Sequence, residues 1–185
     1  MELEAAISAL GDLDARPDAI HRIEAAGANA IPALRVGLSH PYWRVRHMCA
    51  RLLDDLPLDD ATLATLRSVA RDDSHRKVRA QAYHAAGCEP CKPDGAASCE
   101  ADGMGMLGEM IDDRSIRVRR AAATGLLIGV ATGRADPEVS TLLVKLADED
   151  DATISKRVNA ALELLEATGD PKATAQRRVG LNAQT

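Results

Sequence analysis

A Val-Arg pair recurs near the start of successive helical segments, and this repetition constrains the fold more than any other feature of the chain. The interval is 33 residues from Val45 to Val78 and 40 residues from Val78 to Val118, and a blurred copy follows in ISKRVNAALELL. Repeats of this length are typical of stacked helix pairs. The pairs are Val45-Arg46, Val78-Arg79 and Val118-Arg119.

Small and apolar residues follow each valine at helical spacing. Residues four and eight positions after a helical residue lie on its own face, so these rows predict the buried stripe of each second helix. Cys49 lies in the row four positions after the valines. A buried cysteine behaves as a small hydrophobic side chain, so we assign Cys49 no chemistry. The rows are Cys49, Ala82 and Ala122 at four positions, and Leu53, Ala86 and Leu126 at eight.

Apolar periodicity, together with the glycines and prolines that interrupt it, predicts helices and their ends. We expect Asn29 to cap the third helix and Asp59 or Asp60 to cap the fifth. The domain prediction is one repeat array over 1–168, with an N-terminal cap at 1–27, an insertion loop at 88–103 and a polar tail at 169–185. The predicted helices are 2–10, 18–26, 30–39, 43–56, 61–71, 75–87, 104–111, 115–130, 138–147 and 153–167.

Composition limits the class of protein. The chain has no Phe and only 2% aromatic residues, which suits an interior of Ala and Leu between closely approaching helices. Its net charge of −5 argues against binding to nucleic acid, because duplex binders need a basic surface. The sequence has no apolar run long enough to span a membrane and begins with an acidic amphipathic segment rather than a secretory signal. These features predict a cytoplasmic protein without a membrane association.

Three segments resemble HEAT repeats in the turn acid, the Val-Arg pair and the small residues that follow. They are AIPALRVGLSHPYWRVRHMCARLLDDL, LRSVARDDSHRKVRAQAYHAAG and MLGEMIDDRSIRVRRAAATGLL. The resemblance covers about residues 28–167, and it implies an all-α, right-handed α-solenoid of antiparallel helix pairs. It also implies a non-catalytic scaffold or adaptor that binds another macromolecule, chiefly a protein. Some relatives of this fold are lyases, so a lyase-type enzyme is the alternative.

Acidic residues in the turns stand seven positions before arginines of the following helices. A carboxylate in the turn and a guanidinium in the helix predict ion pairs that cap helices and tie neighbouring repeats together. The expected pairs are Asp72–Arg79, Asp112–Arg119 and Asp150–Arg157.

A cysteine-containing segment lengthens the interval between the second and third repeats. Cys88 and Cys91 form a Cys-x2-Cys knuckle, and Cys99 together with His84 could complete a tetrahedral zinc site. A structural zinc ion is therefore the predicted cofactor. Two alternatives remain open: redox-active or disulfide-forming thiols, which would make the protein a thiol-based or metal-responsive regulator, and an inert loop.

A basic row with neighbouring aromatic residues predicts the partner-binding face. Trp and Arg are enriched at the energetic centres of protein interfaces, so we expect a protein partner to bind on the second helices. The alternative is an ordinary solvated helix face, with the tryptophan covering one end of the stack. The predicted partner-binding residues are Trp43, Arg44, His47, Arg51, Lys77, Arg117 and Arg120, with Tyr42 beside them.

Overall fold

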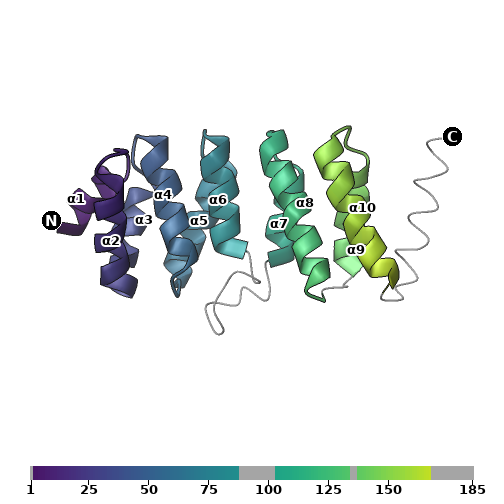
Figure 1. Ribbon diagram of the computed structural model, residues 1–185, viewed down its shortest axis with the longest axis horizontal. Coiled ribbons are helices and arrows are strands. Elements are labelled where there is room, and N and C mark those ends of the chain that lie inside the picture. Colours follow the sequence, from purple (N-terminus) through teal and green to yellow (C-terminus); the bar gives the residue numbers. More distant parts are fainter. Residues whose placement is uncertain (1, 88–102, 134–136, 168–185) are drawn as a thin grey trace. The chain divides into compact units, whose positions relative to one another are not determined.

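Helices account for all regular secondary structure in the part of the chain that the structure describes. The computed structural model describes residues 2–87, 103–133 and 137–167, and no strand occurs among them. Figure 1 shows these helices stacked side by side in each part of the chain. None of the helices in these ranges is both long and apolar enough to cross a membrane.

The chain divides into two compact units, Met1–Gly103 and Met104–Thr185, and each is described by itself. The first unit contains two complete helix pairs and the helices that precede them. Its elements are α1 (Glu2–Ala9), α2 (Arg16–Ala26), the short 3-10 helix η1 (Gly27–Ala30), α3 (Ile31–Gly37), α4 (Trp43–Asp54), α5 (Asp60–Asp72) and α6 (Arg76–Gly87).

Within the first unit, the second helices of successive pairs pack directly against one another. Helix α4 contacts α3 and α6, and α6 also packs against α5. The motif valines Val45 and Val78 are completely buried in these contacts. The Val-Arg valine therefore stabilises the stack by removing its side chain from water between helices.

The second unit repeats this arrangement. Its elements are α7 (Gly103–Ile111), α8 (Ile116–Ala131), α9 (Pro137–Ala147) and α10 (Ala152–Ala167). Helix α10 packs against both α8 and α9, with Val118 and Val158 buried. In both units the row predicted four and eight positions after each valine is buried, which confirms the helical register: Cys49, Leu53, Ala82, Ala86, Ala122 and Leu126.

The helix ends agree with the sequence in part. Gly27 ends α2 with a positive φ of 53°, and Asp59 caps α5 by accepting a hydrogen bond from the backbone N–H of Thr62 at 2.7 Å. The prediction for Asn29 is wrong, because residues 27–30 form a 3-10 turn and Ala30 precedes α3 without a side-chain cap. The 3-10 turn continues the chain directly into α3, so no extended capping residue is needed.

The remaining boundary predictions have different outcomes. Residues 88–102 of the predicted insertion and the predicted tail at 169–185 lie outside the described residues. Gly103, the last residue of the predicted insertion, already belongs to α7. That the pairs form one array over 1–168 stays a prediction, since the two units are described separately.

Candidate functional site

The arginine of each Val-Arg pair binds the turn that precedes its own helix. The Nη1 group donates a hydrogen bond of 2.8 Å to the carbonyl oxygen six residues earlier in three repeats. These carbonyls lie in tight turns, where the backbone offers them no helical partner. The motif arginine is therefore a structural residue: Arg46 binds His40, Arg79 binds Asp73, and Arg119 binds Asp113.

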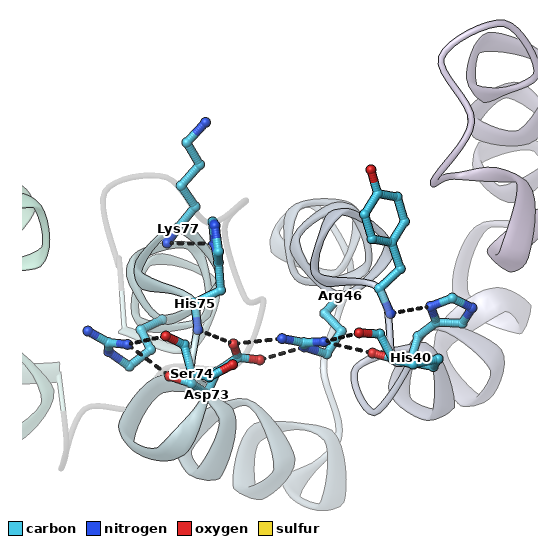
Figure 2. A network of polar contacts seen from close by, with 9 residues as sticks. His40, Arg46, Asp73, Ser74, His75 and Lys77 are labelled. Carbon is cyan, nitrogen blue, oxygen red and sulfur yellow. Dashed lines mark hydrogen bonds and ion pairs between the residues drawn. The ribbon is translucent and has the colours of Figure 1, made fainter.

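Arg46 and Arg119 also reach an acidic residue of the following repeat. Arg46 forms a bidentate contact with Asp73, with Nε–Oδ2 at 2.6 Å and Nη2–Oδ1 at 2.9 Å. Figure 2 shows the Arg46 guanidinium lying between the His40 turn and Asp73. This hydrogen bonding raises the pKa of Arg46. Arg119 likewise lies 2.7 Å from Glu149, so the arginines tie each helix pair to the next one within a unit.

The ion pairs predicted from the seven-residue spacing are wrong. Arg79 donates to the backbone carbonyl of Asp73, while Asp72 accepts a hydrogen bond from Ser68. Asp112 binds Lys145 at 2.6 Å rather than Arg119.

Each of these turns contains two consecutive aspartates, and the second aspartate, not the first, makes the structural contact. Its carboxylate accepts a hydrogen bond from the backbone N–H two residues later and so closes the turn that leads into the following helix. These contacts are Asp73 with His75, Asp113 with Ser115, and Asp151 with Thr153. For the third predicted pair, Asp150–Arg157, Arg157 instead donates to the carbonyl oxygen of Arg120 at 3.0 Å.

Aromatic and basic side chains gather where α4 and α6 begin. The Trp43 ring stacks on the His75 ring, with centroids 3.8 Å apart and an interplanar angle of 12°. The Arg44 guanidinium lies 5.6 Å and the Lys77 ammonium 5.4 Å from the centroid of the same ring, distances at which cation–π attraction operates. We call this group the Trp43 cluster: Tyr42, Trp43, Arg44, His47, His75 and Lys77.

His75 is the member of the cluster that the sequence prediction missed. Its Nδ1 accepts a hydrogen bond from the backbone N–H of Lys77 at 3.3 Å, so the neutral ring carries its proton on Nε2. Burial lowers the pKa of His75, and the charges of Arg76, Lys77 and Arg46 lower it further against the opposing effect of Asp73. The residue stands in a turn outside the helical pattern, so periodicity gave no signal for it.

The structure brings together four of the seven predicted partner-binding residues: Trp43, Arg44, His47 and Lys77. Arg51 lies exposed two turns further along α4, outside the cluster. Arg117 and Arg120 belong to the second unit, where Arg117 is exposed.

The Arg120 side chain is engaged by an acid of the next helix pair. It binds both carboxylate oxygens of Asp151, at 3.1 and 2.6 Å. This contact lowers the pKa of Asp151 to about 2. The positive charge of Arg120, which the sequence placed on the predicted partner-binding face, is therefore neutralised by Asp151.

The predicted zinc ligands fall mostly outside the described part of the chain. Cys88, Cys91 and Cys99 lie in residues 88–102, and no group of three or more His, Cys, Asp or Glu suited to a metal occurs in the ranges that are described. His84 lies on α6, with its Nδ1 2.7 Å from the Asp54 carboxylate of α4. Cys49 is buried, and burial raises the pKa of its thiol to about 12, in agreement with a packing role.

Comparisons with known proteins identify the fold. No protein-family model matches the chain, and no curated protein matches it either. The solved structures do: two engineered proteins solved by the Northeast Structural Genomics Consortium are similar to it. One matches with a TM-score of 0.57 and 20% identity over 97% of this chain and 87% of its own, and the other with a TM-score of 0.52 and 17% identity over 98% and 96%.

A designed armadillo repeat protein, solved in complex with a (KR)4 peptide, also matches over the full length of both chains. Its TM-score is 0.50 and its identity 16%. The protein is a helical repeat protein. The all-α solenoid of helix pairs predicted from the Val-Arg repeat is therefore confirmed.

Proposed function

We propose that the protein is a non-catalytic, HEAT-like scaffold that binds a protein segment through the Trp43 cluster. The observation that carries this proposal is the stack of Trp43 on His75 flanked by the cations of Arg44 and Lys77. Trp, Tyr and Arg dominate the energetic centres of protein interfaces, because they combine a large apolar area with directed polar contacts. Tyr42 and Arg44 are exposed in this chain, so a partner protein can reach both side chains.

The helical-repeat fold supports a binding function as well. Stacked helix pairs present long, rigid surfaces built from successive second helices. The designed armadillo repeat protein holds a peptide, which illustrates that scaffolds of this class bind extended segments. The Trp43 cluster spans α4 and α6, two successive second helices, so a bound segment would cross from one repeat to the next.

The assignment to HEAT-like rather than armadillo-like repeats rests on the number of helices in each repeat. HEAT repeats contain two helices and armadillo repeats three. The repeats formed by α5–α6 and by α9–α10 consist of two helices each, and a short turn joins the two helices of each repeat. The Val-Arg pair and the turn acids at equivalent positions support the same assignment.

The proposal that the protein is non-catalytic rests on the tasks of its polar residues. The turn acids described above close the turns before helices or bind arginines of neighbouring repeats, which accounts for them without acid–base chemistry. The sequence has no Gly-rich phosphate loop and no nucleophile elbow.

Selection from a random peptide library displayed on phage tests this function directly. The full chain is the bait, and W43A/K77A is the matched variant that removes the ring and one flanking cation. We expect the full chain to enrich a family of related peptides that the variant fails to retain, with the far-ultraviolet circular dichroism of both proteins unchanged. Enrichment that is equal for both proteins would rule out the Trp43 cluster as the binding site.

We further propose, from the cysteine spacing alone, that Cys88, Cys91 and Cys99 bind a zinc ion that orders their segment. The Nδ1 of His84 contacts the Asp54 carboxylate, so Nε2 is the ring nitrogen that would serve as the fourth ligand. Metal analysis of untagged protein tests it: we expect about one zinc per chain, lost in C91S. A metal-free chain with titratable thiols would contradict the proposal.

A further inference from the structure

We propose that the segment bound by the Trp43 cluster is an acidic peptide, rich in Asp and Glu. This inference rests on the proposed binding function and specifies the chemistry of the partner.

The beginning of α4 and α6 is a positively charged region. Neither helix has an acidic residue in its first turn, where acids usually compensate the positive end of the helix dipole. Arg44 and Lys77 add full positive charges there. The Asp73 carboxylate lies close enough to raise the pKa of His75, but it is bound by Nε and Nη2 of Arg46. The region therefore favours carboxylates from a partner, although the whole chain carries a net charge of −5.

The cations of the cluster are held in position before a partner arrives. Arg44 lies 5.6 Å from the ring centroids of both Tyr42 and Trp43, and Lys77 lies 5.4 Å from that of Trp43. Side chains ordered in this way lose less conformational entropy when they bind a carboxylate. Arg44 and Lys77 repel a further cation near the Trp43 ring, which argues against a basic peptide such as the one in the designed armadillo protein.

The stacking of Trp43 also distinguishes a peptide from a nucleic acid. Single-stranded nucleic acids bind proteins largely through bases stacked on aromatic faces. One face of the Trp43 ring is covered by His75 at a centroid distance of 3.8 Å, and Tyr42 and His47 form T-shaped contacts with the same ring at centroid distances of 6.4 Å. A base that stacked on this face would have to displace His75, whereas a carboxylate reaches Arg44 and Lys77 with the stack intact.

Titration of the full chain with synthetic peptides of one design tests the inference. The peptides alternate glycine with Glu, Gln or Lys, and an oligothymidylate serves as the nucleic-acid probe. Trp43 is the only tryptophan, so its fluorescence reports binding at the cluster, and calorimetry supplies the dissociation constants. We expect the Glu peptide to bind at least about tenfold more tightly than the Gln peptide, and this preference to weaken as salt is added.

Two double variants carry the same change in net charge. R44Q/K77Q should weaken binding of the Glu peptide by about tenfold or more, whereas R22Q/K156Q, which alters exposed cations outside the cluster, should leave it unchanged. Equal binding of the Glu and Gln peptides, or tighter binding of the oligothymidylate, would overturn the inference. If library-selected peptides nevertheless require Trp43, the proposed binding function stands and only the acidic character of the partner is wrong. If those peptides bind equally well without Trp43, the proposed function and the inference both fail.

Discussion

At the scale of single residues, neighbouring aspartates in one turn have different tasks. Asp73 closes the turn before α6 and binds Arg46 of the preceding repeat, whereas Asp72, one position earlier, accepts a local hydrogen bond from Ser68. The sequence indicated that a turn acid and a motif arginine belong together. It could not indicate which acid, because the contact joins Arg46 to a residue 27 positions later across two helices.

The Asp151 carboxylate gives a residue-scale prediction. Its hydrogen bond with Arg120 lowers its pKa to about 2, so the ionised group stabilises the fold above its unfolded pKa of about 4, and this contribution is lost as the pH falls through the folded value. A carbon-detected NMR titration should give a midpoint of about 2, and R120Q should move it upward toward the ordinary value of 3.8. A midpoint that is the same in both proteins would show that Arg120 does not hold this carboxylate in solution.

Gly37 provides a second residue-scale prediction. A Cβ atom at this position would lie 2.5 Å from Sγ of Cys49 and 2.8 Å from Cγ2 of Ile7, so G37A should lower the free energy of unfolding by about 1–3 kcal/mol. At Gly108 an added Cβ would meet only Leu142, at 3.8 Å. The control G108A should therefore be neutral or stabilising by up to about 1 kcal/mol. Chemical denaturation measures both; a stabilised G37A would contradict the close approach of α3 to α4.

At the scale of elements, the sequence predicts the helices well and the contacts between them poorly. Apolar residues three and four positions apart define each helix, and Gly27 and Pro57 interrupt the pattern locally, so this information lies in short segments. The Trp43 cluster combines a residue of α4 with His75, which lies in the turn before α6. Tyr42, Arg44 and Lys77 were already evident as aromatic and basic residues, but the stack that orders them depends on tertiary packing.

The Arg46–Asp73 ion pair, which joins α4 to the turn before α6, gives a prediction at the scale of elements. The Arg46–Asp73 side chains are 14% and 5% exposed, whereas those of Lys145–Asp112, also 2.6 Å apart, are 57% and 60% exposed. A double-mutant cycle with R46A and D73A should give a coupling energy of about 1–3 kcal/mol. The same cycle on the exposed pair should give less than about 1 kcal/mol. Equal coupling in both cycles would show that burial does not strengthen the inter-repeat tie.

At the scale of the whole molecule, structural and binding roles belong to different arginines. The motif arginines, such as Arg46 and Arg119, bind turn carbonyls and acids of the next repeat and hold each stack together. Arg44, two positions before a motif arginine, lies over two aromatic rings with an exposed side chain. A repeat protein can therefore change its binding surface while its inter-repeat contacts are kept.

Hydrogen–deuterium exchange of the full chain tests the central claim, that the Trp43 cluster is the binding face, most directly. The measurement compares the protein alone with the protein saturated by a library-selected peptide. We predict slower exchange in residues 42–47 and 75–78, with the other described helices unchanged, because the bound segment lies over the beginnings of α4 and α6. Protection confined to other helices, with these two segments exchanging as in the protein alone, would contradict the account.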